Sequence, residues 1–459
     1  MYQIDFQKPL HIHFIGIGGI SMSGLAEILL EEGFTISGSD SRPGPLTLAL
    51  EEKGAQVFYG QKAENIGPNV ELVVYTAAIH PDNPEYARAV SLGLPMLTRA
   101  QLLGQIMKNY EMPIAIAGTH GKTTTTSMVS HILLQADCDP TISVGGILPA
   151  IHGNIRVGHS DTFVTEACEY TNSFLSFFPK VSIILNMDAD HLDFFKDIDD
   201  IRHSFRVFAE LLPSDGALII NADTPEYEQI IKDLPCRVIT YGLEQDAEYT
   251  AADITWDDLG HASFTALWNG APAGHYSLKV PGIHNVSNAL AAIALARFLE
   301  VPDEVITSGL AGFTGTDRRF QYKGVKDGVT IIDDYAHHPT EIEATLQAAK
   351  NYPHKTTWCV FQPHTYTRTK ALLPEFAKAL TLADHVVLAE IYAARETDTL
   401  GISSKDLCEQ IRALGTPCEY FSTFGQIEDF LKNSCTQGDL LITMGAGDVV
   451  NIGENLLEN

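Results

Sequence analysis

Short apolar runs alternate with expected helices at the start of the chain. The apolar runs lie at residues 11–15, 34–40 and 72–75. A helix is expected from about Ser21 to Gly33, because glycine is a favourable residue just past a helix end. Strands and helices that alternate in this way form parallel sheets. The pattern predicts an N-terminal parallel sheet of the dinucleotide-binding, Rossmann-like kind.

The same alternation returns in two later blocks. Expected elements of the second block are strands at residues 114–117, 162–165 and 181–185 and a helix at residues 286–299. Residues 243–280 within it are polar and contain glycine, which predicts a β-rich insert. Expected parallel strands of the third block lie at residues 330–334, 357–361, 385–389 and 439–444. Residues 312–317 are expected to form a hinge between the two blocks.

A run of glycine and threonine between a strand and a helix indicates a phosphate-binding loop. Backbone N–H groups in such a loop point at phosphate oxygens, and the helix N-terminus adds positive potential. Lys122 would reach the terminal phosphates, and Thr123 or Thr124 would hold Mg²⁺. The usual pattern has a glycine where this chain has Ile116, and a threonine-rich helix start capped by its own hydroxyls is the alternative. The candidate nucleotide-binding residues are Gly118, Thr119, His120, Gly121, Lys122, Thr123 and Thr124.

Chain length and these blocks predict an α/β protein of three domains. A chain of 459 residues accommodates two to four domains of roughly 100–200 residues each. We expect a Rossmann-like N-terminal domain at residues 1–107, a central phosphate-loop domain at residues 108–313, and a Rossmann-like C-terminal domain at residues 314–459.

Composition narrows the range of partners. The chain has 30 Lys and Arg against 58 Asp and Glu, a formal charge of −28 at pH 7. An acidic surface repels nucleic acids and anionic membranes, so neither is an expected partner. No apolar run approaches the ~20 residues of a membrane span, and the first residues do not resemble a signal peptide. Seven cysteines without a C-x-x-C pair are expected to be reduced thiols, so a cytoplasmic location is expected.

A second glycine-rich turn follows the first expected strand and opens a helix, so it should bind a diphosphate. The dinucleotide fingerprint has a third glycine where this chain has Ser21, and Asp40 ends the second strand, where an acid would meet a ribose. A nicotinamide or flavin, another nucleotide, or a tight turn without a ligand all fit this pattern. The candidate substrate-binding residues here are Gly16, Gly18, Gly19, Ser21, Ser39, Asp40 and Thr76.

Two further strand ends should meet at the phosphate loop. Glu166 ends one apolar strand and His191 follows the next, and sites in parallel sheets lie at the carboxyl ends of strands. Both are therefore candidate ligands for one or two Mg²⁺ ions. Asn285 and Asn288 share one helix face and could read an adenine edge, although N-capping by Asn285 is the alternative.

Cations and histidines gather beyond the expected hinge. Arg318 and Arg319 are placed to clamp phosphates. His337 and His338 are adjacent and so point in different directions, without a third ligand at zinc spacing, which argues against zinc. Arg368 follows another buried strand and offers a cation for a carboxylate.

Taken together, these residues resemble the Mur ligases, the ATP-dependent amino-acid ligases of peptidoglycan synthesis, and within them the alanine-adding branch. The resemblance covers the whole chain and rests on GIGGISMSG, SGSD, AGTHGKTTT, EACEYTNSF, NMDADHLD, HNVSNALAA, GTDRRF, DDYAHHPTE and FQPHTYTRT. It implies that the N-terminal domain holds a UDP-sugar, the central domain ATP, and the C-terminal domain the amino acid. The implied reaction joins L-alanine to the lactyl carboxylate of UDP-N-acetylmuramate through an acyl phosphate.

The resemblance also implies a role for each candidate residue. Lys122 and Arg319 would contact the ATP phosphates. Asn285 and Asn288 would contact the adenine, and Asp334 would contact the ribose. The implied metal ligands are Thr123, Thr124, Glu166 and His191. The implied amino-acid site consists of Tyr335, His337, His364 and Arg368. The implied catalytic residues are Lys122, Glu166, His191, Arg319 and His337, of which His337 is a candidate base.

Three departures from the family pattern bear on these roles. Phe205 stands where many Mur ligases carry a carbamylated lysine, which the alanine-adding branch also lacks. The chain reads EACEY where many alanine-adding enzymes read EADES, and Thr365 stands where relatives often have arginine. A ligase that recycles murein tripeptide, a nicotinamide dehydrogenase and a non-catalytic UDP-sugar sensor are the alternative functions. The expected oligomeric state is monomer or homodimer.

Overall fold

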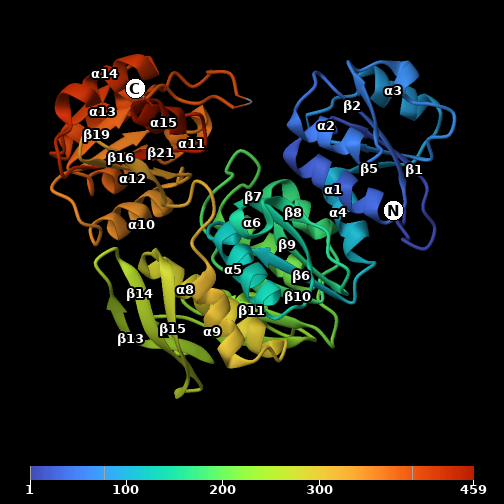
Figure 1. Cartoon of the computed structure of the whole chain (residues 1–459), viewed down its shortest axis with the longest axis horizontal. Helices are drawn as coiled ribbons and strands as arrows, with labels where there is room; N and C mark the ends of the chain where they lie inside the picture. The colour runs from blue at the N-terminus through green and yellow to red at the C-terminus, as the bar shows by residue number, and fades with distance from the viewer. Residues whose placement is uncertain (1, 77, 395, 459) are drawn as a thin grey trace.

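The computed structural model describes residues 2–76, 78–394 and 396–458, and three lobes divide this part of the chain. The N-terminal lobe, blue in Figure 1, and the C-terminal lobe, orange to red, stand apart above the central lobe. Each lobe is built around its own sheet, of five, ten and six strands in chain order. The predicted three-part α/β architecture is therefore confirmed.

The N-terminal sheet is parallel throughout, with strand order β3-β2-β1-β4-β5. Its strands are β1 (His11–Ile15), β2 (Thr35–Asp40), β3 (Gln56–Tyr59), β4 (Leu72–Tyr75) and β5 (Met96–Thr98). Its helices are α1 (Ile20–Glu31), α2 (Pro45–Glu52), α3 (Pro84–Ser91) and α4 (Arg99–Met107). The strand order reverses between β1 and β4, and nucleotides bind at such a switch point. The glycine turn after β1 lies at this point.

The central sheet has the order β15-β14-β13-β12-β11-β10-β6-β9-β7-β8. Its first strands are β6 (Met112–Ala117), β7 (Thr141–Leu148), β8 (Gly153–Arg156), β9 (Thr162–Ala167), β10 (Val181–Ile184), β11 (Ala217–Asn221) and β12 (Arg237–Tyr241). The predicted β-rich insert consists of β13 (Tyr249–Trp256), β14 (His261–Trp268) and β15 (Ala271–Pro281). Because β13 pairs with β12 at Tyr241 and Tyr249, the insert extends the main sheet.

Helices cover the central sheet and carry the phosphate loop. They are α5 (Lys122–Gln135), α6 (Ile198–Ala209), α7 (Tyr227–Ile231), α8 (Ile283–Phe298) and α9 (Asp303–Gly312). Alanines recur along the second half of α8, and every residue from Asn288 to Ala296 is buried. Small side chains let α8 pack closely on the sheet and on α5, which is how the start of α8 reaches the phosphate loop.

The C-terminal sheet has the order β16-β17-β21-β18-β19-β20. Its strands are β16 (Gln321–Lys326), β17 (Val329–Asp334), β18 (Thr357–Phe361), β19 (His385–Leu388), β20 (Cys418–Tyr420) and β21 (Leu440–Met444). Its helices are α10 (Pro339–Ala349), α11 (Tyr366–Ala371), α12 (Leu373–Leu380), α13 (Ser404–Ala413), α14 (Phe424–Ser434) and α15 (Val450–Glu458). The four strands predicted for this block, β17, β18, β19 and β21, are parallel as expected. The strand β16, which the sequence did not predict, pairs antiparallel with β17 at one edge.

All seven cysteines lie among the described residues as free thiols. Within the same part of the chain, we find no helix that is both long and apolar enough to cross a membrane.

Candidate active site

The phosphate loop joins β6 to α5 through two glycines that no other residue could replace without strain. Gly118 has φ 143°, and an added Cβ would lie 2.9 Å from Leu185 Cβ. Gly121 has φ 83°, and its Cβ would lie 2.8 Å from Asn288 Oδ1. Asn186 holds the loop from the next strand, because its Oδ1 accepts from His120 N at 2.8 Å and its Nδ2 donates to His120 O at 3.1 Å. The loop thus presents its N–H groups at the start of α5, as the sequence predicts.

Lys122 lies in this loop as a buried, paired cation. Its ammonium donates to Gly118 O and Thr119 O and contacts Glu169 Oε2 at 3.0 Å. Burial alone would lower the pKa of Lys122, but the Glu169 carboxylate outweighs burial and raises it. Lys122 therefore stays charged and is available to phosphates.

The structure brings Glu166 beside the phosphate loop. Glu166 on β9 pairs in register with Ile116 on β6, and its Oε1 accepts from Gly145 N at 2.6 Å. A Cβ on Gly145 would lie 2.9 Å from Glu166 Oε2, so the carboxylate needs this glycine.

His191 follows β10 in a left-handed conformation, φ 54°, and its ring stacks on Tyr170 at a centroid distance of 4.4 Å. Burial lowers the pKa of His191, so the ring is neutral and keeps a lone pair for a metal ion. Tyr170 belongs to the EACEY segment, and its hydroxyl donates to Asp193 Oδ2 at 2.7 Å. The tyrosine that departs from the EADES pattern thus orients the candidate metal ligand.

A cavity of about 560 Å³ collects most of the predicted catalytic side chains. It lies between the central and C-terminal lobes, and its wall includes residues from β9, the β10 loop and the hinge. The predicted site residues that line it are Thr119, His120, Gly121, Lys122, Thr123, Glu166, His191, Arg319, Tyr335 and His337. The predicted meeting of separate strand ends at the phosphate loop is therefore observed.

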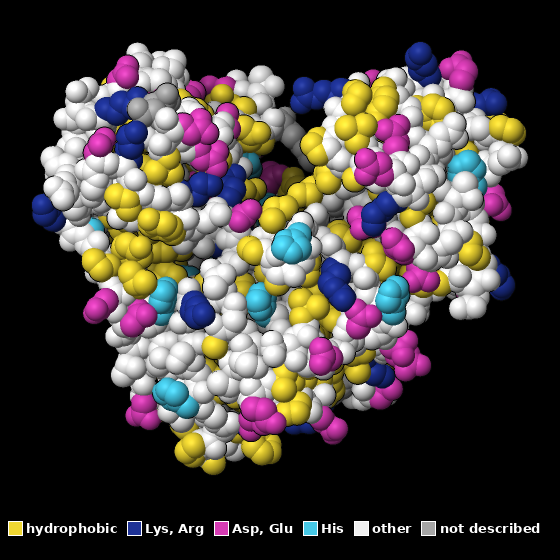
Figure 2. Space-filling view, in the orientation of Figure 1, with side chains coloured by type: hydrophobic (Ala, Val, Ile, Leu, Met, Phe, Trp, Pro, Cys, Tyr) yellow, Lys and Arg dark blue, Asp and Glu magenta, His cyan; other side chains and the backbone are white. Residues whose placement is uncertain are grey.

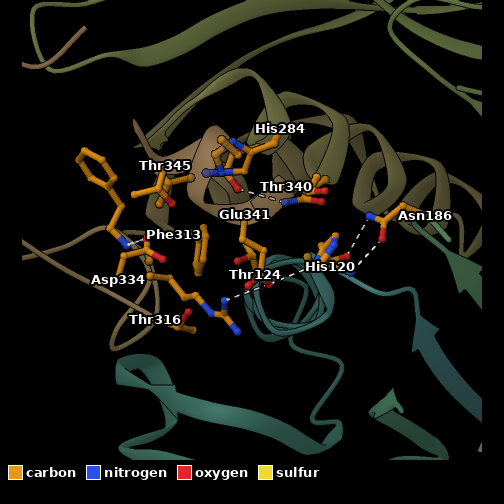
Figure 3. A pocket seen from close by; sticks show the side chains of 18 of the residues that line it. His120, Thr124, Asn186, His284, Phe313, Thr316, Asp334, Thr340, Glu341 and Thr345 are labelled. Carbon is orange, nitrogen blue, oxygen red and sulfur yellow. Dashed lines mark hydrogen bonds and ion pairs between the residues drawn. The ribbon is translucent and has the colours of Figure 1, made fainter. Parts of the chain in front are cut away.

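An adjoining cavity of about 200 Å³ opens on the other side of the loop (Figure 3). The predicted residues that line it are His120, Gly121, Thr124, Asn285, Asn288, Arg319 and Asp334. In Figure 3, Thr124 from α5 faces Thr340, Glu341 and Thr345 from α10 across this space.

Asn285 and Asp334 are both held in place at this cavity. Asn285 lies inside α8, where its Nδ2 donates to Pro281 O at 2.7 Å and its Oδ1 accepts from Asn288 at 3.1 Å, so the N-cap alternative is wrong. Asp334 accepts from Ala336 N at 2.7 Å and Phe320 N at 2.8 Å, and burial raises its pKa to about 6.

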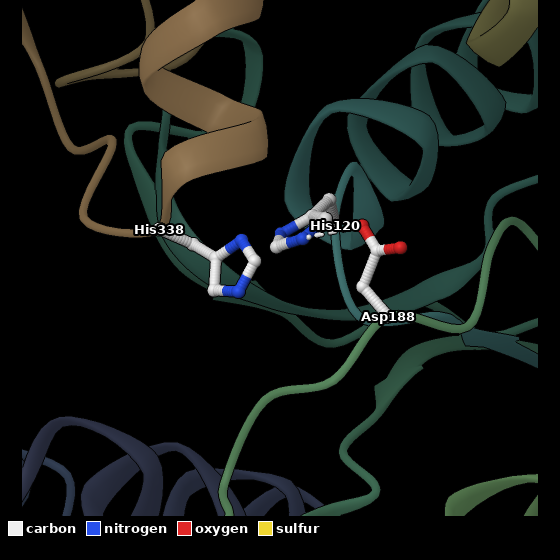
Figure 4. A group of neighbouring side chains, drawn as sticks. All are labelled: His120, Asp188 and His338. Atoms are coloured by element: carbon white, nitrogen blue, oxygen red, sulfur yellow. Dashed lines mark ion pairs between the residues drawn. The ribbon is translucent and has the colours of Figure 1, made fainter. Parts of the chain in front are cut away.

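His120 connects the central and C-terminal lobes (Figure 4). Its Nε2 lies 3.0 Å from Asp188 Oδ2 in the central lobe, and its Nδ1 lies 3.2 Å from Glu341 Oε1 on α10. Burial would lower the pKa of His120, but the two carboxylates outweigh it and raise it to about 9. His338 packs beside it at a ring distance of 4.8 Å. Both ring nitrogens of His120 thus face carboxylates, one from each lobe.

The predicted amino-acid site contains an ion pair between lobes. Arg368 on α11 contacts Asp190 Oδ1 through Nε and Nη2, each at 2.9 Å. Its Nη1 donates to His364 Nδ1 at 2.8 Å, and burial lowers the pKa of His364 to about 4. Beside Arg368 lies a cavity of about 110 Å³, which Asp190, His191, Thr365 and Leu372 help to line.

His337 is neutral and has one defined tautomer. Burial lowers its pKa to about 4, and its Nδ1 lies 3.0 Å from Tyr335 O, an acceptor. Nδ1 therefore carries the proton and Nε2 the lone pair.

The two hinge arginines have different environments. Arg318 contacts Asp333 Oδ2 at 3.0 Å and donates to Gly447 O at 3.0 Å and Gly445 O at 2.7 Å. Arg318 therefore holds the C-terminal sheet, and it also lines the larger cavity, so its expected contact with phosphates stays a prediction. Arg319 lines both the cavity of about 560 Å³ and the cavity of about 200 Å³, and its Nη1 lies 3.9 Å from Glu341 Oε1.

The N-terminal glycine turn comes directly before Ile20, which lines the larger cavity. Gly18 N donates to Asp40 Oδ2 at 2.8 Å, and an added Cβ at Gly18 would lie 2.7 Å from the same oxygen. Ser21 Oγ accepts from Arg99 at 3.1 Å. A methyl group of Thr76 lies beside Gly16, 3.6 Å from where its Cβ would be, and Gly19 precedes α1.

Ser39 is a correction to the predicted set. Its side chain is fully buried and its hydroxyl donates to Glu85 Oε2 at 2.6 Å, so it supports β2 and cannot touch a ligand. Figure 2 shows a hollow between the N-terminal and C-terminal lobes.

Family models match almost all of the chain. They are the Mur ligase family catalytic domain at residues 11–111, the Mur ligase middle domain at residues 116–296 and the Mur ligase glutamate ligase domain at residues 318–447. The chain is 63% identical over 458 residues to the UDP-N-acetylmuramate–L-alanine ligase of Agathobacter rectalis, covering 100% of both chains. The chain belongs to the Mur ligase family. The ligase of the same name from Lachnospira eligens is 62% identical to this Mur ligase over 459 residues, again with 100% of both chains covered.

Solved structures of two Mur ligases share the whole architecture. The UDP-N-acetylmuramate–alanine ligase of Thermotoga maritima superposes with a TM-score of 0.81 at 30% identity, covering 98% of both chains. A murein peptide ligase from Psychrobacter arcticus has a TM-score of 0.71 at 26% identity, also covering 98% of both. The alanine ligase and the murein peptide ligase are thus both similar in fold to this Mur ligase.

Sequence reasoning missed four residues of this Mur ligase site. Glu341 faces His120, Arg319 and His337. His284 lines the smaller cavity, Arg99 contacts Ser21, and Glu169 pairs with Lys122. Glu341, Glu169 and His284 lie in segments that carry the family resemblance, so the sequence could have marked them as site candidates. Their contacts, however, involve distant parts of the chain.

Proposed function

We propose that this chain joins L-alanine to the lactyl carboxylate of UDP-N-acetylmuramate at the expense of ATP. The observation that carries the proposal is the cavity that Lys122, Glu166, His191, Arg319 and His337 line together. The near-complete match to ligases of that name supports the same substrates. The N-terminal lobe would hold the sugar nucleotide. The smaller cavity would hold the adenine and ribose of ATP, and the C-terminal lobe would hold the amino acid.

The first step transfers a phosphoryl group. A lactyl carboxylate oxygen attacks the γ-phosphorus of ATP, the bond to the β-phosphate oxygen breaks, and ADP leaves. Lys122 and Arg319 offset the charge on the transferring group, while Asn285 and Asn288 position adenine and Asp334 the ribose. Positioning and charge stabilisation supply most of the acceleration in such reactions.

The second step forms the amide. The neutral amine of L-alanine attacks the acyl carbon, and the tetrahedral intermediate expels inorganic phosphate. Arg368 and His364 hold the carboxylate of L-alanine, and Tyr335 shapes the site beside them. His337 Nε2 has the lone pair to take the amine proton, although its low pKa makes it a weak base. Closure of the lobes before the reaction would protect the acyl phosphate from water.

The residues near the loop fit a divalent cation. A threonine hydroxyl and a carboxylate are oxygen ligands of the kind Mg²⁺ prefers, and His191 has a neutral ring. Thr123, Thr124, Glu166 and His191 would hold the ion. Bound there, Mg²⁺ supplies positive charge that neutralises the phosphate oxygens.

We also propose three functional units at residues 1–107, 108–313 and 314–459, each contributing one substrate site. A cytoplasmic location suits a reaction that consumes ATP and a nucleotide sugar. We propose a monomer or homodimer without a nucleic-acid partner.

The deciding experiment measures phosphate release from ATP with UDP-N-acetylmuramate and L-alanine, L-serine, glycine or the murein tripeptide in turn. Release that needs both the sugar nucleotide and L-alanine is expected. Release with the tripeptide alone would assign the chain to the recycling branch. No release with any acceptor would contradict a ligase.

A further inference from the structure

Glu169 is a buried carboxylate with one oxygen left without a hydrogen bond. It follows β9 at the start of a short 3₁₀ segment, and only 2% of its surface is exposed. Oε2 contacts Lys122 Nζ at 3.0 Å. Oε1 has no hydrogen-bond partner among the described residues and lies 4.0 Å from His191 Nε2. A buried acceptor is rarely left unpaired, so each such group calls for an explanation.

The space between Glu169 and His191 suits a cation. A separation of 4.0 Å is too long for a hydrogen bond. Two ligands at the ~2.1 Å distance of an octahedral Mg²⁺ lie about 3 Å apart when adjacent and about 4.2 Å apart when opposite. The observed separation falls within this span. Tyr170 stacks on the His191 ring, so the ring is held in the orientation that faces Glu169.

Nucleotide binding would free the second oxygen of Glu169. In this structure Lys122 contacts Glu169. The γ- and β-phosphates of ATP would attract the same ammonium, because Lys122 is the loop lysine that phosphates contact. As Lys122 turned toward phosphate, Oε2 would lose its partner, and both carboxylate oxygens would face the metal position.

We propose that Glu169 is a protein ligand of the divalent cation that His191 binds, and that it pairs with Lys122 when no nucleotide is present. This proposal rests on the metal site of the proposed function and adds a residue to it. Glu169 therefore has two exchangeable partners, a lysine before ATP binds and a cation afterwards.

Mn²⁺ binding to the full chain with ADP, followed by electron paramagnetic resonance, tests the proposal. Glu169→Gln removes the charge and keeps the shape, and we expect the Mn²⁺ affinity at the His191 position to fall by at least ~10-fold, as is common when a metal site loses a supporting group. Glu169→His restores a metal-ligating atom without a partner for Lys122, and we expect partial recovery of Mn²⁺ affinity. Glu210→Gln is the matched control, because Glu210 pairs with Arg206 on the surface at 2.8 Å.

The outcomes separate the two roles of Glu169. Full Mn²⁺ affinity in Glu169→Gln would overturn the proposal and leave Glu169 only as the partner of Lys122. Equal loss in Glu169→Gln and Glu169→His would also overturn it, provided that both variants bind ADP in the absence of metal. If Glu169→Gln does not fold, the Mn²⁺ affinity of Glu169→His decides alone. Recovery of affinity supports the proposal, and its loss overturns it. Phosphate release by the wild-type chain is measured separately, so a failed ligase assignment is distinguished from a failed metal ligand.

Discussion

At the scale of single residues, Lys122 is the side chain whose loss should reduce activity most. Lys122 is buried and bound to Glu169 and to carbonyls of its own loop. Lys122→Ala should reduce phosphate release by at least ~10²-fold, as for loss of one charge-stabilising donor. UDP-N-acetylmuramate binding, measured by calorimetry, should change little, because the glycine turn lies in another lobe. Lys8→Ala, on a side chain that is 83% exposed, is the control. Equal loss of turnover and sugar binding would contradict separate sites.

Variants of Tyr170 test how the His191 ring is held in place. They separate the stacking of Tyr170 on His191 from its hydrogen bond to Asp193. Tyr170→Phe keeps the ring on His191 and loses the bond to Asp193, so it should bind Mn²⁺ almost as the wild type does. Tyr170→Ala loses the ring as well, and an aromatic pair is worth about 0.5–1.5 kcal/mol, or about 2–12-fold in affinity. Paramagnetic resonance measures both variants. Identical binding by the two would show that the stack does not orient His191.

The sequence placed a residue correctly at the larger cavity where that residue lies beside its own loop or strand end. Lys122, Glu166 and His191 fall in this class, because a strand and its following turn fix their position. Glu341 and Arg99 were missed, since each matters through a partner far away in the sequence. Ser39 was wrongly included because a strand-end position does not reveal which way a small side chain points.

At the scale of elements, the phosphate-loop helix depends on a close helix crossing. Gly309 on α9 packs against α5, and an added Cβ would lie 2.7 Å from Ile132 Cα, a backbone atom that cannot move aside cheaply. Gly309→Ala should reduce the free energy of unfolding by about 1–3 kcal/mol. Thermal unfolding followed by circular dichroism should show a lower midpoint.

Gly312→Ala on the same helix is the control for this prediction. The nearest atom to its added Cβ is His131 Nδ1 at 3.7 Å, an ordinary contact, so this change should be neutral or slightly stabilising. If both variants melt alike, the crossing of α5 and α9 is not tightly packed.

Element types were predictable where hydrophobic periodicity is strong. The buried strands β10, β17 and β18 and the helix α8 follow from their apolar runs. Strand direction at a sheet edge was not predictable, because β16 has exposed positions and its antiparallel pairing comes from a short turn to β17. The β-rich insert was predicted, but its place in the main sheet was not, because that place depends on the pairing of β13 with β12.

At the scale of the whole molecule, the central and C-terminal lobes meet through charged side chains at the active site. Arg368 contacts Asp190 across the boundary, and His120 lies between Asp188 and Glu341. The first pair stays charged over the ordinary pH range, because Arg368 lowers the pKa of Asp190 even though burial opposes this. His120 is therefore the group that makes the contact between lobes sensitive to alkaline pH.

The sign of this effect follows from the pKa of His120, about 9 when the lobes are together against an ordinary 6.5. Separation removes Glu341 and lowers that pKa, so closure favours the protonated ring. The stabilisation is complete below the pKa of the open form and is lost as pH rises through about 9. Arg319 and His337 also face Glu341, and His338 packs on His120, but burial keeps both neighbouring histidines neutral.

We therefore expect the ADP-bound chain to become more extended between pH 8 and pH 10, as a larger radius of gyration in small-angle X-ray scattering. His120→Asn cannot be protonated and should remove this transition, and Glu341→Gln should shift it to lower pH because one carboxylate is gone. A radius that rises equally in wild type and His120→Asn would assign the opening to another group. Since the phosphate loop and α10 meet through this one imidazole, the same titration should raise the KM for ATP at alkaline pH in the wild type and not in His120→Asn.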